Sequence, residues 1–300
     1  MAINFIEFSH PGKQISFTSK SGTRWQYNPK QIIVGLRYWN QDPSHYRKFF
    51  QVNAELDNGK TENVQFWGEF EAATTFERVK NNDYTQFPNA IHKPKFTPLD
   101  SNITPTDLLE KYKYQNTDPF CWEDIWKYQE CRTQKYGFLR DLDKYSVIVM
   151  GTEYKMGFAV DTVFVVKESG LVSELFDKKW LFSDYYWQVT GRVFESLYID
   201  RTTKNIIKPD HRWYNCITKE DNEPIWSFIP CKLSTPNGHH RFYMDYKKYN
   251  LQKPGAGIVC YRLKGQDGVD LLKNESIQMW NTLREDMINQ GYLCLNKIKS

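Results

Sequence analysis

Residues 146–167 read SVIVMGTEYKMGFAVDTVFVVK and contain two apolar runs, 146–151 and 157–166. Each run has the length of a strand, and we predict between them a loop that contains Glu153, Lys155 and Gly157. A strand whose residues are apolar without interruption requires cover on both faces, as at the centre of a sheet. The sequence therefore predicts that residues 146–150 and 158–166 are neighbouring inner strands of one sheet.

Strand signals also precede and follow this stretch. β-branched and aromatic residues dominate residues 4–10, 14–19, 31–38, 64–71, 192–199, 224–233, 241–246 and 256–263. Helical signals are fewer. They predict a helix opened by Thr104 and Asp107, a helix that follows the turn at 116–119 and continues through Arg132, a short helix within 169–182, and a C-terminal helix from Ser276 to Asn289 that Gly291 ends. A last strand is possible at 291–295. Because strands dominate and helices intrude irregularly, we predict an α+β fold, with a strand-rich mixed sheet, peripheral helices and a C-terminal helix.

Domain organisation is predicted from length and loop composition. Three hundred residues suit one large domain or two modest ones, and we predict a single globular unit over residues 1–300. Residues 81–105 are rich in Pro, Asn and Asp and form the longest loop-like stretch, with His92 inside it. Any internal boundary is therefore expected within 81–105.

Charge and aromatic content limit the function classes. The chain has 40 basic and 36 acidic residues, a formal charge of +4, which does not favour a broad DNA-binding face. It also has 19 Phe, 19 Tyr and 10 Trp residues, a high proportion. Aromatic side chains fill cores, and they also form the walls of ligand sites, so both interpretations stay open.

The cysteines and the N-terminus bear on the compartment. Six cysteines are widely spread without a CxxC pair, and the first residues lack the basic and apolar segments of a secretory signal. No apolar run approaches the 18 or so residues of a membrane span. We expect a soluble cytoplasmic protein with unpaired cysteines and no membrane association.

Familiar catalytic and metal motifs are absent. The sequence has no glycine-rich nucleotide loop, no HExxH and no GxSxG motif. His239 and His240 follow Cys216 and Cys231 at spacings that match no common zinc pattern, so neither a metal nor a cofactor is predicted. Asp161 interrupts an apolar run. It is either a buried functional acid or a carboxylate satisfied at a sheet edge, by a neighbouring threonine or by a backbone amide.

Polar and aromatic residues gather in residues 31–71. Strand periodicity puts Trp67, Glu69 and Glu71 on one face, with the two carboxylates roughly 7 Å apart. A carboxylate beside an imidazole can perform general acid–base chemistry, while arginine and tryptophan hold phosphates and planar bases. We therefore predict catalytic roles for three residues and ligand-binding roles for four. The first set is Glu69, Glu71 and His45, and the second is Arg47, Trp39, Trp67 and His92. The alternative is an exposed, charged sheet face with surface ion pairs.

Two classes of function follow from this constellation. The first is an enzyme, such as a hydrolase, that acts on a nucleotide or a nucleic-acid base through the carboxylates and histidine. The second is a non-catalytic module that binds a nucleotide, a nucleic acid or a partner protein, or a scaffold subunit of a larger complex. A histidine within hydrogen-bond reach of Glu69 or Glu71 in a concave pocket favours the first, and a shallow aromatic and basic groove favours the second.

Overall fold

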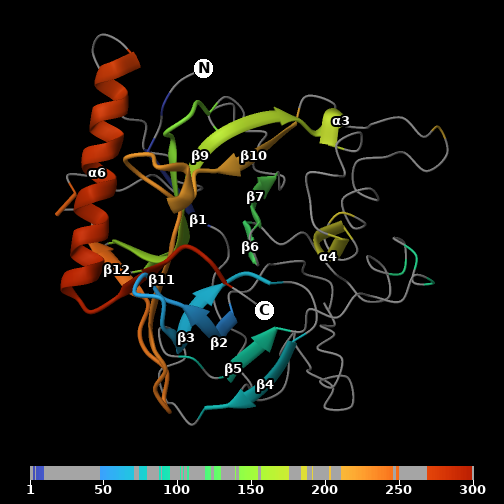
Figure 1. The fold of residues 1–300 in the computed structure, drawn as a ribbon, viewed down its shortest axis with the longest axis vertical. Coiled ribbons are helices and arrows are strands. Elements are labelled where there is room, and N and C mark those ends of the chain that lie inside the picture. The colour runs from blue at the N-terminus through green and yellow to red at the C-terminus, as the bar shows by residue number, and fades with distance from the viewer. Residues whose placement is uncertain are drawn as a thin grey trace.

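A computed structural model places the chain in two sheets and one long helix (Figure 1). The structure describes residues 3, 5–9, 48–70, 74–79, 88, 90–94, 102, 104, 107, 119–122, 125–129, 139, 142–154, 157–175, 184–187, 191, 203, 211–245, 248–249 and 269–298. Several predicted segments lie outside these residues, namely the strands expected at 14–19, 31–38, 192–199 and 256–263.

The first sheet has seven strands, and its order is β1-β8-β9-β10-β7-β6, with β12 also on β9. Its members are β1 (Phe5–Ser9), β6 (Phe120–Trp122), β7 (Ile125–Gln129), β8 (Val147–Tyr154), β9 (Gly157–Leu171), β10 (Arg212–Cys216) and β12 (Phe242–Asp245). The pair β1–β8 is parallel and the other pairs are antiparallel. Along one edge, β9 pairs with β8. Along the other edge, from its N-terminal end, it pairs first with β12, then with Phe228 and finally with β10.

The hairpin of β8 and β9 confirms the prediction from residues 146–167. The two strands pair antiparallel from Val147↔Val165 to Tyr154↔Gly157, so Glu153 and Gly157 belong to the strands and not to a loop. All residues of β9 from Gly157 to Val166 are buried. The hairpin therefore lies at the centre of the sheet, as its continuous apolar character requires.

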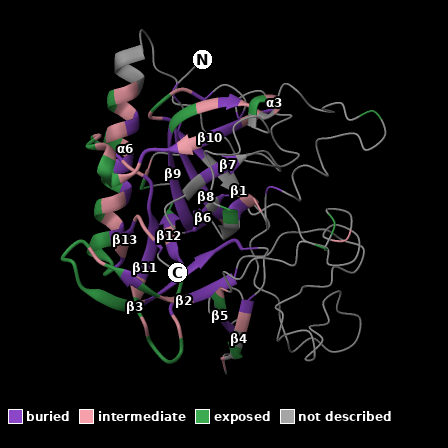
Figure 2. Cartoon of the chain, turned by 45° about the vertical axis from the view of Figure 1, so that its right-hand side comes forward, coloured by how far each residue is buried: buried purple, intermediate pink, exposed green. Residues whose placement is uncertain are grey.

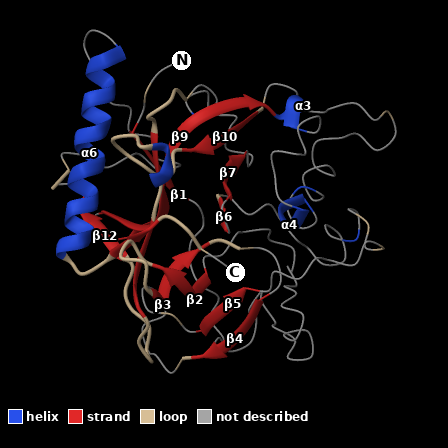
Figure 3. Cartoon of the chain, viewed as in Figure 1, coloured by secondary structure: helices blue, strands red, loops and turns tan. Residues whose placement is uncertain are grey.

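The second sheet has six strands in the order β13-β11-β3-β2-β5-β4. Its members are β2 (Lys48–Glu55), β3 (Thr61–Gly68), β4 (Thr74–Arg78), β5 (Ala90–Pro94), β11 (Ile229–Leu233) and β13 (Leu293–Leu295). Only β2–β5 is parallel among the pairs described here. Both sheets are thus mixed, and strands dominate the described chain (Figure 3).

Two apolar cores give the molecule its layers (Figure 2). One core joins the two sheets, since Ile148 and Phe164 of the first sheet share it with Phe50 and Phe66 of the second. The other lies between the first sheet and α6 (Val269–Asn289), and Trp280 of that helix belongs to it. The order of layers is therefore helix, seven-stranded sheet and six-stranded sheet.

The C-terminal helix and strand confirm two further predictions. Gly291 has a φ of +77°, its N–H donates to the carbonyl of Ile288, and the N–H of Tyr292 donates to that of Met287. This left-handed turn ends α6 where the sequence predicted, because glycine adopts such a φ without a steric penalty. β13 then follows. The structure therefore confirms a strand-rich fold with mixed sheets and a C-terminal helix. In the described ranges, no helix is long and apolar enough to cross a membrane.

Shorter helices complete the described elements. These are α3 (Val172–Leu175), α4 (Asp184–Tyr186) and the 3₁₀ turn η5 (Lys219–Asp221). The predicted cap at residue 104 is present, because Thr104 Oγ1 accepts from the N–H of Asp107 at 3.1 Å. The Asp107 carboxylate accepts in return from the N–H of Thr104.

The helix predicted after residue 119 is wrong. Residues 120–122 and 125–129 form the antiparallel strands β6 and β7, in which Trp122 pairs with Ile125, and β7 then pairs with β10 through Tyr128↔Tyr214. The Tyr128 and Tyr214 rings stack at 5.8 Å. Local helix propensity is a weak preference, and here pairing with a distant strand overrides it.

The prediction of an uninterrupted loop at 81–105 is also wrong. Residues 90–94 form β5, which pairs parallel with β2 and antiparallel with β4. Its first three residues are buried. The prolines and asparagines around it are genuine loop signals, but a short strand between them depends on partners that are distant in the sequence. The domain boundary proposed for this region stays a prediction.

Candidate functional site

Three of the seven predicted site residues can be placed. Trp67, Glu69 and His92 are all buried, with exposed fractions of 2%, 1% and 1%. The alternative of an exposed charged face therefore does not hold for these three. The other four, Trp39, His45, Arg47 and Glu71, lie outside the described residues.

The structure does not bring Trp67 and His92 together. Trp67 pairs with Phe49 across β2 and β3, and His92 pairs with Phe50 across β2 and β5. Because successive residues of β2 point to opposite faces, the two side chains leave opposite faces of the six-stranded sheet. His92 lies on the face of Phe50, 6.0 Å from its ring, and its Nδ1 is 3.0 Å from Thr74 Oγ1.

Glu69 follows the end of β3. The strand was predicted over 64–71, but it runs from Thr61 to Gly68, so strand periodicity does not fix where Glu69 and Glu71 point. The carbonyl of Glu69 accepts a hydrogen bond from Trp122 Nε1 at 3.1 Å. Lys48 Nζ donates to the next carbonyl, that of Phe70, at 2.5 Å. The catalytic role of Glu69 stays a prediction.

Trp67 of the six-stranded sheet contacts a buried ion pair that belongs to the seven-stranded sheet. The guanidinium of Arg241 lies 4.3 Å from the centre of the Trp67 ring, and its Nε lies 3.2 Å from Oδ1 of Asp161. The side chains of Arg241 and Asp161 are 3% and 0% exposed. The ring that the sequence predicted to stack a ligand is thus in contact with a side chain of the protein itself.

A β-bulge places Asp161 for this contact. Met150 pairs with Thr162 and Gly151 with Val160, so Asp161 is the extra residue in β9. A bulge turns one side chain away from the regular alternation of the strand. Asp161 is therefore buried, as one of the two interpretations expected, and its carboxylate is paired with Arg241. Sequence reasoning missed Arg241 because it lies far along the chain, immediately before β12.

His239 fixes the segment that carries Arg241. Its Nε2 lies 2.8 Å from the carbonyl oxygen of Gln65 and its Nδ1 lies 2.7 Å from that of His240. Burial lowers the pKa of His239, although both backbone contacts favour the protonated ring. Trp67 Nε1 donates to the His239 carbonyl at 3.4 Å. These contacts hold residues 239–241 against β3.

A second aromatic and charged arrangement lies beside α6. The guanidinium of Arg284 lies 5.2 Å from the Trp226 ring and 5.8 Å from the Trp280 ring. Trp280 Nε1 donates to the Trp226 carbonyl at 2.9 Å, which fixes the two indoles relative to each other. Lys219 Nζ is 6.0 Å from the Trp226 ring. Trp280 is buried, whereas Trp226 and Arg284 are half-buried.

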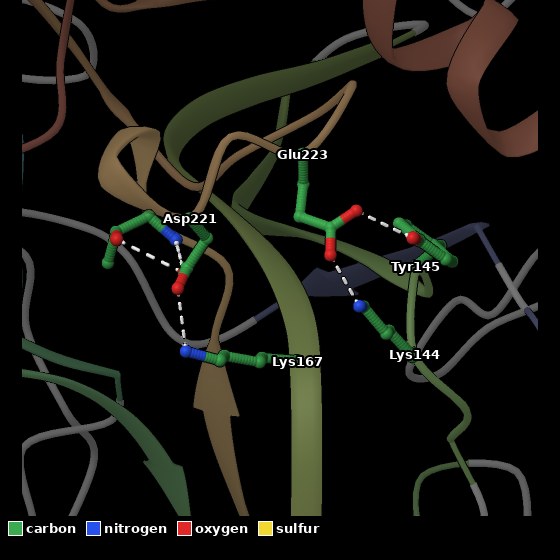
Figure 4. A network of polar contacts seen from close by, with 6 residues as sticks. Lys144, Tyr145, Lys167, Asp221 and Glu223 are labelled. Carbon is green, nitrogen blue, oxygen red and sulfur yellow. Dashed lines mark hydrogen bonds and ion pairs between the residues drawn. The ribbon is translucent and has the colours of Figure 1, made fainter.

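Tyr145 repeats this arrangement nearer the start of α6. Its ring has the ammonium of Lys273 at 4.1 Å and that of Lys144 at 5.0 Å. Its hydroxyl donates to Glu223 at 2.7 Å, and its carbonyl accepts from Ser276 of α6 at 2.8 Å. Figure 4 shows Glu223 between Lys144 and Tyr145, and Asp221 bonded to Lys167. We call Tyr145, Lys219, Trp226, Lys273 and Arg284 the aromatic–cationic strip.

Four carboxylates near the strip form ion pairs, whereas two cations of the strip form none within the described residues. The ion pairs are Glu223–Lys144, Asp221–Lys167, Asp57–Lys219 and Glu220–Lys297. The hydrogen bond from Lys144 lowers the pKa of Glu223, so this carboxylate stays charged at neutral pH. Within the described ranges no carboxylate forms an ion pair with Lys273 or Arg284. The strip therefore has two cations that form no ion pair within the described residues, and one of them, Lys273, lies near enough to Glu223 to lower its pKa.

Lys127 is another residue that the sequence did not single out. It is buried on β7, with its ammonium 5.3 Å from the Trp213 ring. Burial lowers its pKa to about 8, against the opposing effect of Glu168. For metal chemistry, the described residues contain no group of three or more His, Cys, Asp or Glu side chains that could hold an ion.

Comparison with known proteins adds no assignment, since no protein family, curated protein or solved structure matches this chain.

Proposed function

We propose that this chain is a non-catalytic module that binds a nucleotide or a nucleic-acid base through the aromatic–cationic strip. The observation that carries the proposal is Arg284, whose guanidinium contacts two indoles and has no carboxylate partner among the described residues. Bases stack on aromatic rings and on guanidinium planes, and an arginine without an acid offers its N–H groups to a phosphate.

The strip supports this function better than the cluster around Trp67 does. Trp67 and Arg241 are almost fully buried and Arg241 is paired with Asp161, whereas Trp226 and Arg284 are half-buried. The catalytic hypothesis based on Glu69, Glu71 and His45 gains no support from the described geometry, because Glu69 is buried beside Trp122. We also propose that the protein is cytoplasmic, and that its fold is α+β with further peripheral helices.

Calorimetric titration with nucleoside monophosphates and a short oligonucleotide tests the proposal. We expect binding by the native protein and a clear loss of affinity in Arg284→Gln and Trp226→Leu. Arg284→Gln keeps the length of the side chain and removes its charge. The matched control is Lys93→Gln, which removes an exposed cation on the far sheet, 3.9 Å from Glu77. The proposal fails if no nucleotide binds, or if Lys93→Gln loses as much affinity as Arg284→Gln.

A further inference from the structure

We infer that the ligand of the aromatic–cationic strip is single-stranded nucleic acid, held along α6 with one base at Trp226 and another at Tyr145. This inference rests on the proposed function and adds the ligand class and its path. A single nucleotide needs one ring and one cation. The strip offers that combination twice, as Trp226 with Arg284 and as Tyr145 with Lys273.

The spacing along α6 aligns the two combinations. Lys273, Ile277, Trp280 and Arg284 follow one another at helical spacing, so they lie on one side of the helix. Lys273 and Arg284 are about three turns apart, or roughly 16 Å at a rise of 1.5 Å per residue. At the spacing of about 3.4 Å per phosphate of a fully stacked strand, this distance is spanned by at most about five nucleotides.

The wall opposite α6 is the segment from Thr218 to Phe228. Glu223 binds the Tyr145 hydroxyl, and the Trp226 carbonyl binds Trp280, so both rings lie where this segment meets the helix. Tyr145, Trp226 and Ile277 are partly buried at the edge of the core beneath α6. The rings are thus held from behind by the core, and ordered rings lose little entropy when a base stacks on them.

Charge and ring chemistry favour a single strand over other anionic partners. In a duplex the bases are stacked on each other, so their faces are not available to Tyr145 and Trp226. An acidic peptide would satisfy Lys273 and Arg284 but would leave the rings unused. Single strands supply planar faces and phosphates together, and stacking is tolerant of base identity.

Fluorescence anisotropy with end-labelled oligothymidylate tests the path, with lengths from one to about eight nucleotides. We expect affinity to rise with length up to about five nucleotides and then to level. Lys273→Gln should weaken the longer oligonucleotides more than the mononucleotide, which retains the combination of Trp226 with Arg284. Each cation removed should reduce the slope of log affinity against log salt by about 0.7. Tyr145→Leu should lower affinity for the longer strands about five- to a hundredfold.

Controls separate the path from the proposed function. Tyr145→Phe keeps the ring and should lose less affinity for the longer strands than Tyr145→Leu, while Lys93→Gln should bind like the native protein. Thermal unfolding of each variant identifies loss of folding, and Lys273→Gln remains informative if Tyr145→Leu unfolds. Equal affinity for one and eight nucleotides would overturn the path and leave the proposed function standing. Absence of binding at every length would overturn both. Equal affinity for duplex DNA or for polyglutamate would also overturn the inference, since it would reveal attraction by charge alone.

Discussion

Asp161 is the extra residue of a bulge in β9, and its carboxylate lies 3.2 Å from Nε of Arg241 at the start of β12. Both side chains are almost fully buried, and the Trp67 ring lies against the guanidinium. A buried ion pair gains little over an apolar pair, but removal of one partner leaves an uncompensated charge. The second sheet contacts this pair through the Trp67 ring, so loss of the pair should be felt at the junction of the sheets.

We expect Asp161→Asn to lower the free energy of unfolding by about 3–5 kcal/mol, because the guanidinium of Arg241 stays buried without its acid. Urea unfolding measures the change. The double variant Asp161→Leu with Arg241→Met should recover part of the loss. Glu77→Gln, which breaks an exposed pair with Lys93, is the control and should leave the midpoint unchanged. A single Asp161 variant as stable as the native protein would contradict the prediction.

Ser227 replaces a missing strand partner on β9. The N–H of Val165 donates to Ser227 Oγ at 2.8 Å, between the bridge at Phe228 and the start of the β10 ladder. Ser227→Ala should cost about 1–3 kcal/mol, since it leaves a buried N–H without an acceptor. Thr282→Ala removes an exposed helical hydroxyl and should be neutral or slightly stabilising. Equal unfolding midpoints for the two variants would show that Ser227 has no such role.

The burial of β9 on both faces gives a third prediction. Val163 belongs to the core beneath α6 and is 0% exposed, so Val163→Asp should cost several kcal/mol by burying an unpaired charge. The control is Leu233→Asp, the same kind of change at a residue that is 54% exposed. This variant should have the same free energy of unfolding as the native protein. Chemical unfolding compares the two. A folded Val163→Asp protein of native stability would place this residue at the surface.

The sequence predicted those parts of the fold that depend on local pattern. The apolar runs of β8 and β9 indicate burial on both faces without reference to other segments, and Gly291 marks the end of α6 by its own backbone freedom. β5 and the β6–β7 pair were missed. Their strand character depends on β2 and β10, which are distant in the sequence.

The candidate site likewise has a part that local sequence predicts and a part that depends on residues distant in the sequence. The apolar neighbours of Asp161 predicted that it is buried or specially satisfied, but nothing near it in the sequence indicates Arg241 as its partner. The aromatic–cationic strip combines residues from near 145, from 219–226 and from α6. Only one local signal was available for it, the helical spacing of Lys273 and Arg284 with Trp280.

The cysteines give a fourth prediction. The sequence predicted that all six are unpaired, and Cys216, Cys231 and Cys294 are free in the structure. Burial raises the pKa of Cys216 and of Cys294 to about 12, so very little thiolate exists at pH 8. Alkylation followed by peptide mapping should leave both unmodified in the native protein and label six thiols after denaturation. Rapid native labelling of Cys216 would contradict its burial.

The last prediction concerns pH and His239. Burial lowers the pKa of this imidazole, with a smaller contribution from Lys232, while the carbonyls of His240 and Gln65 oppose the shift. The unfolded chain therefore binds a proton at a higher pH than the native protein does. The unfolding free energy should fall as pH decreases below the ordinary imidazole pKa of about 6.5, by at most about 1.4 kcal/mol per pH unit from this group. Above that pH the group is neutral in both states and contributes no slope.

His239→Gln removes the titrating group, and its stability should depend less on pH between 7 and 5 than that of the native protein. His240→Gln changes the exposed neighbouring ring and should keep the native pH dependence. Urea unfolding at a series of pH values measures both. If His239→Gln kept the full loss of stability on acidification, or if His240→Gln abolished it, the proton would bind elsewhere and the buried imidazole would not be the group that links folding to pH.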